Sequence, residues 1–461
     1  MRWLLRVVLL LTIFMGLAVN AETLPVAQLW QSSEDGKLQL STGAPLPFVD
    51  GNGASESRIT VNDSTRYQSI LGLGASFEHA TCQNLFKLPE EKRAAVIRSL
   101  VHPVDGIGMN LIRVCIGASD FIGEPYYSYN DLPPGQTDLP LEHFSIEKDR
   151  AYVLPVIKAA QAANPDLLFF ASPWSPPGWM KTGGTLNGGK LRPEFYDVYA
   201  RYLVKFIQAY AAEGVPMRAI TVQNEPQHTD PNYTTTLWTG IEQRDFIQAN
   251  FGPALRAAGL QTPIWCWDHN WNQPEFPRAV LSAPGAAQYV EGSAWHFYEG
   301  EVEAQSRFRE EFPNKDIFFT EGSTFGTKGA IQIIEILRNW ARSYNAWVIM
   351  LDEHRKPNRG PHFASATCIE LQDDGSVEYR FDYYMYGQFM KFIPRDAIRI
   401  DSGPTEKNFA HVAFLTPDQR IVLVIANADR KDRKFSVAWQ GRSLDMQMGG
   451  RSVATLSWPA K

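Results

Sequence analysis

The sequence predicts an α/β fold, a (β/α)8 TIM barrel, with an accessory β-sandwich built from both ends of the chain. Two observations support this prediction. In the middle of the chain, strand-like apolar runs alternate with segments of helical spacing, and at both ends short alternating segments are separated by turn residues. The divisions that we expect are 1–21, a signal peptide, 22–66, an N-terminal β segment that joins the sandwich, 67–394, the (β/α)8 barrel, and 395–461, the C-terminal sandwich.

The first 21 residues are typical of a secretory signal peptide. Arg2 and Arg6 supply the positive start, Leu4 to Leu17 is almost wholly apolar, and Val19 to Ala21 offers small residues for cleavage. The apolar run is short for a membrane span, which needs about 20 residues, and no later segment approaches that length. We therefore expect a secreted or periplasmic protein with no integral membrane span. A retained anchor is the alternative.

Short apolar runs, many of them rich in β-branched or aromatic residues, recur through the middle of the chain. They are Gln68–Gly74, Leu111–Ile116, Leu167–Ala171, Ala219–Gln223, Pro263–Trp267, Gly292–His296, Asp316–Thr320 and Ala346–Leu351. Between them, segments such as Tyr196–Ala212 and Ile331–Ser343 place apolar residues at helical steps. Eight strands that alternate with helices form a parallel barrel, and functional groups project from the carboxyl ends of its strands.

The two ends of the chain have a different character. Lys37–Ser41 and Arg58–Val61 alternate polar and apolar residues, and Gly and Asn clusters separate them. The C-terminal runs that are typical of strands joined by turns are Arg420–Ala426, Lys434–Trp439 and Ser452–Trp458. We expect both ends to pair into one β-sandwich.

Composition argues against several classes of function. The formal net charge is −6, and loss of residues 1–21, which hold two arginines and no acid, lowers it by two to −8. A mildly acidic surface argues against nucleic acid as the main partner. The cysteines lie far apart without paired spacing, so we expect no zinc site. Whether any two of them form a disulfide stays open.

Polar or aromatic residues follow each of the predicted barrel strands. In chain order they are Glu78, Asp120, Trp174, Asn224 with Glu225, Asp268 to Asn270, His296 with Tyr298, Glu321 and Asp352. Any single one of them could equally cap a helix. Their recurrence around the barrel predicts a functional site at its carboxyl end.

Two glutamates are the most informative of these residues. Thr221–Pro226 and Ile317–Glu321 each carry a glutamate at the end of an apolar run. Because strand interiors avoid glutamate, these two placements suggest chemistry rather than packing. Two carboxylates across one cleft are the machinery of glycoside hydrolysis, in which one protonates the leaving oxygen and the other attacks or activates water. A separation of about 5–5.5 Å gives retention and about 6.5–9.5 Å gives inversion. The sequence leaves that distance open.

Several motifs in order resemble glycoside hydrolase family 30, most closely its glucosylceramidase branch, over about residues 60 to 400. They are Leu111–Phe121, Ala171–Lys181, Thr221–Pro226, Gln243–Ile247, His296–Tyr298, Phe319–Glu321 and, at the junction to the C-terminal β domain, Tyr386–Pro394. The resemblance implies that Glu225 is the general acid/base and Glu321 the nucleophile. It also implies that Asn224 binds the sugar 2-hydroxyl, and that Asp120 and Trp174 hold the outer hydroxyls of the sugar.

Physical chemistry adds supporting roles. Glu321 must stay ionised, which a guanidinium favours, and Arg113 inside the second strand is the candidate; an ion pair with another acid is its alternative role. Tyr298 can hydrogen-bond the nucleophile. Tyr233 and Trp179 line the cleft wall or serve packing. We expect His296 and His269 to orient other groups rather than act as bases, and we expect no metal and no cofactor.

The segment Trp347–Pro361 departs from the family pattern, because Met350 replaces a second tryptophan and the loop is more charged. This departure bears on the identity of the leaving group more than on the hydrolytic chemistry. We expect a secreted, retaining β-glycosidase that acts on β-glucosides, with glucosylceramide the first substrate and contact with lipid-borne substrate possible. The alternative is a polysaccharide-directed relative, a β-1,6-glucanase or β-xylosidase. A non-catalytic carbohydrate-binding protein is a remote alternative, and the oligomeric state stays open.

Overall fold

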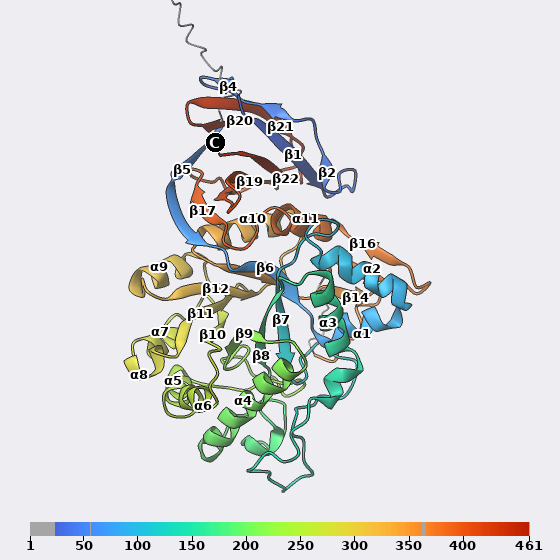
Figure 1. Ribbon diagram of the computed structural model, residues 1–461, viewed down its shortest axis with the longest axis vertical. Coiled ribbons are helices and arrows are strands. Elements are labelled where there is room, and N and C mark those ends of the chain that lie inside the picture. Colours follow the sequence, from blue (N-terminus) through green and yellow to red (C-terminus); the bar gives the residue numbers. More distant parts are fainter. Residues whose placement is uncertain (1–23, 56, 361–365, 461) are drawn as a thin grey trace, which may run out of the picture.

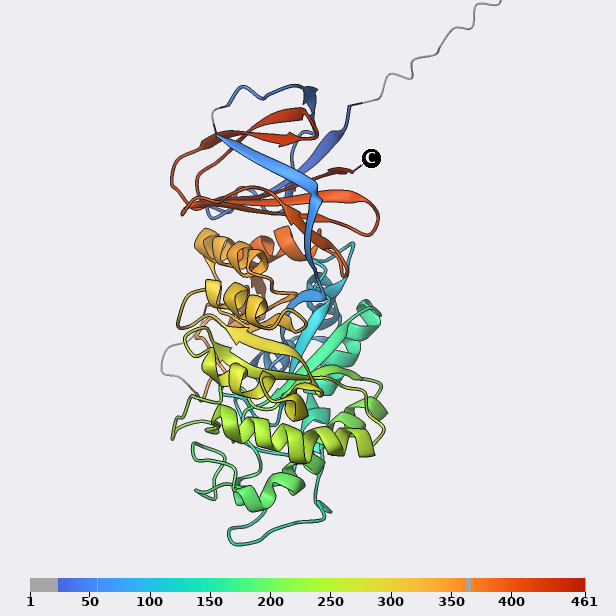
Figure 2. The same cartoon turned by 90° about the vertical axis from the view of Figure 1, so that its left-hand side faces the viewer.

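The structure, a computed structural model, describes residues 24–55, 57–360 and 366–460 and has two stacked parts (Figure 1). A barrel forms the larger part and a β-sandwich lies at one end of it. Helices α10 (Gly326–Arg338) and α11 (Phe381–Met390) lie between the two (Figure 1, Figure 2). The predicted fold class is therefore confirmed. The predicted signal peptide, 1–21, lies outside the described residues.

Eight parallel strands form the barrel, in the order β12-β11-β10-β9-β8-β7-β6-β13. Their bounds are β6 (Gly72–Ser76), β7 (Leu111–Ile116), β8 (Leu168–Pro173), β9 (Met217–Thr221), β10 (Ile264–Asn270), β11 (Val290–His296), β12 (Asp316–Glu321) and β13 (Ser343–Ala346). Bridges between Ile317 and Ala341 and between Gly322 and Ala346 join the two outer strands of that order. The carboxyl ends of the strands therefore surround one opening.

Two of the predicted barrel strands are displaced. The run Gln68–Gly74 contains the end of β5 (Arg58–Ser69), which belongs to the sandwich, and β6 begins only at Gly72. The prediction of Ala346–Leu351 as the eighth strand is wrong, because β13 ends where that run begins. Met350 starts β14 (Met350–Asp352), which pairs with β15 (Ile369–Leu371) in a small sheet completed by β16 (Val377–Tyr379). The run is apolar because it packs beside α1, where the Met350 amide donates to Thr81 Oγ1.

Helices connect successive barrel strands and cover the barrel (Figure 1). Besides α10 and α11, the α-helices are α1 (His79–Lys87), α2 (Glu90–Val101), α3 (Val153–Ala163), α4 (Tyr196–Ala212), α5 (Gly240–Phe246), α6 (Gly252–Ala257), α7 (Glu275–Leu281), α8 (Pro284–Ala287) and α9 (Glu303–Glu311). The bounds of α4 are those predicted. The second predicted helix, Ile331–Ser343, corresponds to α10, which begins earlier, at Gly326, and also ends earlier, at Arg338. Ser343 already belongs to β13.

The sandwich contains strands from both ends of the chain, as predicted. They are β1 (Val26–Ser33), β2 (Ser41–Thr42), β3 (Leu46–Pro47), β4 (Val49–Asp50), β5, β17 (Ile398–Asp401), β18 (Phe409–Leu415), β19 (Arg420–Asn427), β20 (Arg433–Trp439), β21 (Arg442–Met448) and β22 (Ser452–Pro459). The N-terminal β1 pairs with the C-terminal β22. β5 pairs with β17 in one layer and with β20 in the other, so this long strand joins the layers and then leads into the barrel (Figure 2). Of the predicted strand Lys37–Ser41, only Ser41 lies in a strand.

An apolar layer fills the barrel below its opening. Leu111, Phe170, Trp265 and Phe318 contact one another there, and the rings of Trp265 and Phe318 stack with centroids 3.9 Å apart. Such a layer makes the barrel a packed core rather than a pore. The polar side chains that the strands carry above this layer therefore rest on well-packed apolar side chains.

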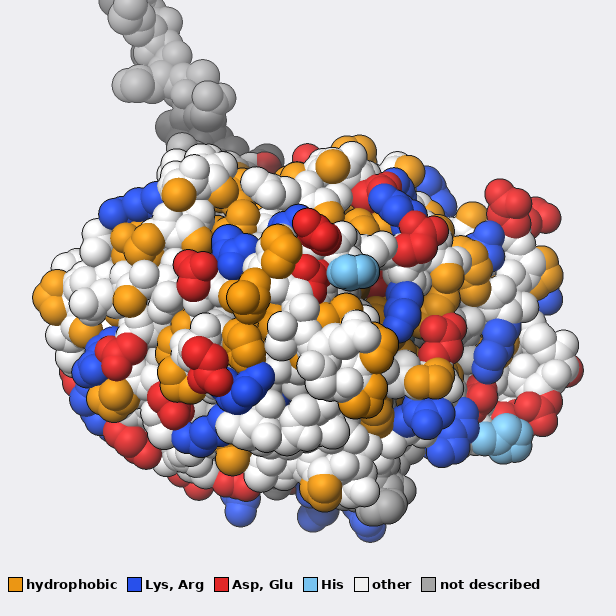
Figure 3. Space-filling view, turned by 90° about the horizontal axis from the view of Figure 1, so that it is seen from below, with side chains coloured by type: hydrophobic (Ala, Val, Ile, Leu, Met, Phe, Trp, Pro, Cys, Tyr) orange, Lys and Arg blue, Asp and Glu red, His pale blue; other side chains and the backbone are white. Residues whose placement is uncertain are grey.

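The four cysteines are all buried and carry free thiols. Within the described ranges, no helix combines the length and apolar character that crossing a membrane requires. On the face of the molecule farthest from the sandwich, basic and acidic side chains are interspersed (Figure 3). That distribution fits a partner without strong charge of its own.

Candidate active site

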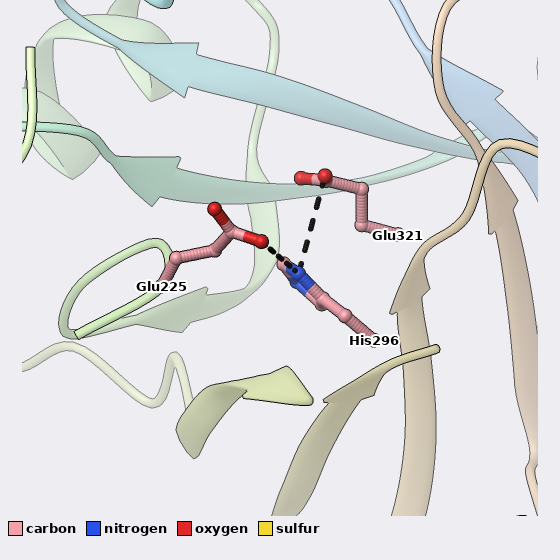
Figure 4. A group of neighbouring side chains, drawn as sticks. All are labelled: Glu225, His296 and Glu321. Carbon is pink, nitrogen blue, oxygen red and sulfur yellow. Dashed lines mark hydrogen bonds and ion pairs between the residues drawn. The ribbon is translucent and has the colours of Figure 1, made fainter. Parts of the chain in front are cut away.

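The two glutamates singled out in the sequence meet at the barrel opening (Figure 4). Glu321 is the last residue of β12, and Glu225 lies in the loop that follows β9. An oxygen of each carboxylate and a ring nitrogen of His296 all lie within 4.8 Å of one another. A single bond of a bound molecule can therefore contact both carboxylates.

Glu321 has fixed partners. Arg113 Nη1 donates to Glu321 Oε2, and the Tyr298 hydroxyl donates to Oε1 at 2.8 Å. Arg113 projects from β7, is fully buried, and places its Cζ 4.9 Å from the centre of the Trp174 ring. A permanent cation thus contacts the carboxylate for which the sequence predicted one. The same guanidinium also pairs with Asp268 at 2.9 Å, so the alternative role of Arg113 applies as well.

Glu225 has titratable partners instead. His296 Nδ1 lies 3.2 Å from Glu225 Oε1, and His269 Nε2 lies 3.8 Å from the same oxygen. The backbone of Glu225 has φ +47°, a region that surroundings must impose on a residue other than glycine. Its amide donates to the Asp268 carbonyl at 3.0 Å, and the Asn224 amide donates to the Pro173 carbonyl at 2.8 Å. These bonds hold the loop against β8 and β10 and turn the carboxylate into the opening.

Asp268 connects the two sets of partners, and the sequence analysis gave it no role. It lies in β10, has φ +73°, and is fully buried. Its two carboxylate oxygens accept hydrogen bonds from Arg113, Ser172, Thr221, Thr320 and His296. Its place at a strand end was visible in the sequence. Its burial and its five donors come from side chains on five different strands, which no local pattern reveals.

His296, at the end of β11, contacts both aspartate and glutamate. Nε2 lies 3.1 Å from Asp268 Oδ1, and Nδ1 faces Glu225 and lies 3.9 Å from Glu321 Oε1. Burial alone would lower the pKa of His296, but the charge of Glu321 and the hydrogen bonds to Asp268 and Glu225 raise it to about 9. The imidazole is therefore a cation at neutral pH. It contacts both carboxylates, and the predicted orienting role stays a prediction.

The pKa directions of the two glutamates are the reverse of those expected for an acid and a nucleophile. For Glu225, burial acts upward, but the hydrogen bond from His296 and the charge of that imidazole lower the pKa to about 2. For Glu321, burial raises the pKa against the effects of His296 and Arg113. The two carboxylates share one group of charges and titrate as a pair. The protonated state of His296 is what keeps Glu225 ionised in this ligand-free arrangement.

The closed end of the site holds Asp120, Trp174 and Asn224. Asp120 is buried, its Oδ1 has no hydrogen-bond partner among the described residues, and burial raises its pKa, as do the charges of Glu321 and Glu225. Trp174 is buried beneath the opening and stacks on Trp347, with centroids 5.3 Å apart. Asn224 Oδ1 accepts from Arg113 Nη2 at 2.7 Å, which leaves the amide NH2 for a ligand. An unpaired carboxylate oxygen beside a tryptophan is suited to a sugar with several hydroxyls.

The cavity above the glutamates has a volume of about 570 Å³. Besides the two glutamates and Asp120, its lining consists of Phe121, Gln227, His228, Tyr233, His269, Asn270, Asn272, Gln273, Tyr298, Glu299, Ser323 and Trp347. Tyr233 lines the cavity, as one of its two predicted roles requires, and its hydroxyl lies 2.6 Å from His228 Nε2. Most of these residues offer hydrogen-bonding groups, and Phe121 and Trp347 add aromatic faces.

Arg113, Trp174, Asn224, Asp268 and His296 lie buried beneath the lining of this cavity, and three other residues considered in the sequence lie away from the site. Trp179 donates through Nε1 to Asn130 and borders a separate hollow, so it packs rather than lining the cleft wall. Glu78 caps α1 by accepting from the Thr81 amide at 2.7 Å. Asp352 lies in β14 and pairs with Lys87. The last two positions show the helix-cap and surface roles that isolated acidic residues often have.

Glu225, His296 and Glu321 have the residue types of a metal site, and so do the exposed Glu353, His354 and Asp373. In the first group, Nε2 of His296 is engaged by Asp268 and Nδ1 by Glu225. A protonated imidazole has no lone pair for a metal. The donor set of the barrel opening therefore suits proton transfer better than metal binding.

The arrangement of a barrel, a sandwich and two facing glutamates agrees with the comparisons with known proteins. The model of the glycosyl hydrolase family 30 TIM-barrel domain matches residues 70–393, and that of the family 30 beta sandwich domain matches residues 396–456. The chain therefore belongs to glycosyl hydrolase family 30, as its motifs indicated, and is a glycoside hydrolase.

Among curated relatives, an endo-1,6-beta-D-glucanase of Neurospora crassa is 34% identical over 80% of this chain and 81% of its own length. The lysosomal acid glucosylceramidase of Mus musculus is 30% identical over 93% of this chain and 88% of its own. A solved endo-beta1,6-glucanase matches 94% of this chain and 100% of its own, with a TM-score of 0.85 and 28% identity. The family thus includes relatives with two of the activities that the sequence analysis considered, β-1,6-glucanase and glucosylceramidase.

Proposed function

We propose that this protein is a retaining β-glucanase that hydrolyses β-1,6-linked glucose polymers. The observation that carries the mechanism is the approach of the two carboxylates, whose nearest oxygens are no more than 4.8 Å apart. A pair that is about 5–5.5 Å apart leaves no room for an attacking water between carboxylate and sugar, so one carboxylate must attack directly. This spacing supports retention and argues against inversion.

The partners of the two glutamates decide their roles in this proposal. Glu321 attacks the anomeric carbon, because Arg113 and Tyr298 stabilise it as an anion and aim it. Glu225 protonates the leaving oxygen and later activates water, because no Lys or Arg among the described residues pairs with it and its side chain is more exposed, at 19% against 6%. The Asn224 NH2 group donates to the 2-hydroxyl.

The reactive protonation state is one proton shift away from the arrangement described above, in which His296 is protonated and Glu225 ionised. If the Nδ1 proton of His296 moves along its 3.2 Å contact to Glu225, Glu225 becomes the acid while Arg113 keeps Glu321 ionised. The shift creates no net charge in the site. A bound sugar that excludes water favours the neutral imidazole and the neutral acid over the separated charges.

The identity of the substrate is supported by the relatives and by the open end of the cleft. The relative at 34% identity and the solved structure at TM-score 0.85 are both endo-β-1,6-glucanases. The polar residues Gln227, Asn272, Gln273 and Glu299 can bind the hydroxyls of a second sugar. A ceramide tail would desolvate these groups without hydrogen-bonding them. We therefore rank β-1,6-glucan above glucosylceramide, the reverse of the order reached from the sequence.

Glucosylceramide remains the second candidate because of one specific observation. The mouse lysosomal acid glucosylceramidase aligns over 93% of this chain, through barrel and sandwich alike. The closed end, where Asp120 and Asn224 lie, would bind the same terminal glucose in either substrate. The two candidates differ only in what occupies the polar, open end.

A substrate panel tests the proposal. The purified protein would be given linear β-1,6-glucan, linear β-1,3-glucan, aryl β-xyloside, aryl β-glucoside and glucosylceramide, with product anomers followed by NMR. We expect turnover of β-1,6-glucan to be highest, with β products formed first and shortening of the polymer throughout its length. Initial α products, or glucosylceramide cleaved faster than the glucan, would contradict the proposal.

The control separates chemistry from folding. Glu321→Gln should abolish turnover on every substrate, whereas Glu291→Gln should retain it. Glu291 is also a glutamate of a barrel strand, but it lies at the opposite end of β11, paired with Arg218. Equal loss in both variants would point to damage of the fold.

We also propose that the protein is exported, on the basis of the charged and apolar pattern of residues 1–21. Expression of the full sequence with a C-terminal tag in a bacterial host, followed by fractionation and N-terminal sequencing, tests this. Mature protein that begins near residue 22 outside the cytoplasm is the expected result. Uncleaved protein in the cytoplasm would contradict it.

A further inference from the structure

The mechanism proposed above leaves Asp268 unused, although it is the most heavily hydrogen-bonded acid of the site. It is fully buried below both glutamates and cannot touch a sugar bound in the cavity, whose lining does not include it. Its side chain accepts from Arg113 at 2.9 Å and from His296 at 3.1 Å. Those two donors are the direct partners of Glu321 and Glu225 respectively.

Asp268 reaches the acid through a second path, its backbone. The Asp268 carbonyl accepts the Glu225 amide at 3.0 Å. Asp268 itself is at φ +73° beside Trp267 at +78°, where the pairing of β10 with β11 shifts register. Two successive non-glycine residues in the left-handed region cost folding free energy, which surrounding contacts must offset. The distortion turns the Asp268 side chain toward the barrel axis and its carbonyl toward Glu225.

The hydrogen bond of Asp268 fixes which nitrogen of His296 can exchange a proton. An ionised carboxylate only accepts, so Nε2 must carry a hydrogen in every state in which this contact persists. Arg113 and the hydroxyls of Ser172, Thr221 and Thr320 keep Asp268 ionised. Nδ1 is then the one site on the ring whose proton can leave, and Nδ1 faces Glu225.

We propose that Asp268 is a positioning residue that, through His296, places the proton that Glu225 donates in catalysis. This inference rests on the proposed function for the role of Glu225. With Asp268 ionised, His296 alternates between an imidazolium facing a Glu225 carboxylate and a neutral Nε2–H imidazole facing a Glu225 carboxylic acid. Both states keep every hydrogen bond. One proton moves between Nδ1 and Oε1, and no other atom changes its bonding.

The groups that face His296 make this arrangement specific. Asp268 faces Nε2, while Glu225 and Glu321 face Nδ1. The rings of His269 and Tyr298 flank the imidazole with centroids 6.1 Å away. His269 is held neutral, because burial lowers its pKa to about 4. The two glutamates change their charge during the proposed reaction, whereas Asp268 stays ionised. Its hydrogen bond to His296 can therefore persist throughout.

Asp268→Asn tests the proposal, because it keeps the shape and removes the charge. Its amide can donate to Nε2 and thereby drive the proton onto Nδ1, the wrong tautomer. We expect kcat on phenyl β-glucoside to fall by about 100-fold, as small misplacements of catalytic groups cause. The loss on dinitrophenyl β-glucoside, whose leaving group needs no acid, should be at least about tenfold smaller. Equal losses on both substrates would overturn the proposal.

A second measurement does not depend on activity. In protein labelled with ¹⁵N-histidine, with the His296 signal identified by its absence in His296→Gln, wild type should show an imidazolium at pH 7. Asp268→Asn should show a neutral ring there. The matched control is Asp149→Asn, since Asp149 is also buried and accepts from the hydroxyls of Tyr127, Tyr129 and Tyr210 away from the site. Asp149→Asn should leave the His296 signal unchanged.

The wild type alone provides a further check, in case Asp268→Asn does not fold. Above the midpoint of its titration, neutral His296 should be the Nε2–H tautomer, which ¹⁵N shifts identify. A neutral Nδ1–H ring, or an imidazolium that persists at pH 7 in folded Asp268→Asn, would overturn the proposal. Absence of turnover on all β-glucosides in wild type would instead refute the proposed function and leave the NMR result standing.

Discussion

The two halves of the cleft differ in the kind of charge that each glutamate meets. Around Glu321 the partner is a guanidinium, which stays positive at any accessible pH, and a phenol that only donates to it. Around Glu225 the partners are imidazoles, which unlike a guanidinium can gain or lose a proton within the accessible pH range. Two chemically identical side chains thereby have different electrostatic surroundings, which is the basis of the different functions that we propose for them. The difference teaches that a nucleophile needs a permanent partner, whereas a residue that gives and takes a proton needs one that can do the same.

The largest test of this comparison removes each glutamate in turn and adds azide. Glu225→Ala should lose hydrolysis of phenyl β-glucoside by about 10²–10⁴-fold, the usual contribution of a general acid, and azide should restore turnover of dinitrophenyl β-glucoside with a β-azide product. Glu321→Gly should lose hydrolysis by more than that, and azide should give the α-azide. NMR of the products distinguishes the two. Exchange of the two product anomers between the variants would reverse our assignment of roles.

The next test weakens the permanent cation. Arg113→Lys keeps one charge but cannot reach Glu321, Asn224 and Asp268 at once, as the guanidinium does. Loss of a fixed donor to a charged group in a site of this kind costs about 10²–10³-fold in kcat. The pKa of Glu321 should rise, and because the nucleophile reacts only when ionised, the acidic limb of the kcat/KM profile should move to higher pH. A profile that keeps its acidic limb would show that Arg113 is structural only.

A smaller effect is expected from the phenol. Tyr298→Phe removes the 2.8 Å hydrogen bond to Glu321 and leaves the ring, which is partly exposed, in place. A hydrogen bond to a charged group contributes about 1.5–3 kcal/mol, so kcat/KM should fall by about ten- to a hundredfold. As a control, Tyr233→Phe removes a cleft hydroxyl that contacts His228 rather than a carboxylate. If both variants lose the same activity on phenyl β-glucoside, the comparison between the two halves loses its basis.

The last test concerns stability rather than activity and distinguishes the titratable half. The pKa of His296 is raised to about 9 from an ordinary value of 6.5. Its contribution to the free energy of unfolding is therefore complete below about pH 6.5 and is lost as the pH rises through about 9. For this fully buried group the loss is on the order of 3 kcal/mol. Urea unfolding at several pH values checks it, and His296→Gln should show a flatter dependence over the same range.

Much of the fold was predictable because its signals are local. The helical period of Tyr196–Ala212 and the apolar runs of most barrel strands depend on burial of one face or of a whole strand, which the sequence expresses directly. The eighth strand was misplaced because Val348–Leu351 is as apolar as a barrel strand but is buried beside α1. Periodicity records that a segment is buried and does not record against what.

The sequence predicted those site residues that stand out by their own position in the chain. Glu225 and Glu321 stand out because glutamates are rare at the ends of apolar strands, and Arg113 because it interrupts one. Asp268 was not assigned because its importance lies in five donors from five strands. The role of Trp179 stayed open between lining the cleft and packing, because the sequence does not show that its indole donates to Asn130. The leaving group depends on loop side chains that converge only in three dimensions.

Pairing of the first strand with the last has a consequence for biosynthesis. As the chain leaves the ribosome, β1 appears early, whereas its partner β22 follows only after every barrel strand has been made. β2 and β3 can pair with β1 at once, but the edge of β1 that β22 will cover stays unpaired until then and can associate with other nascent chains. A stop codon that removed β22 would thus also leave β1, the first strand to be synthesised, without its partner. The damage from a C-terminal truncation would therefore extend to the N-terminal strand.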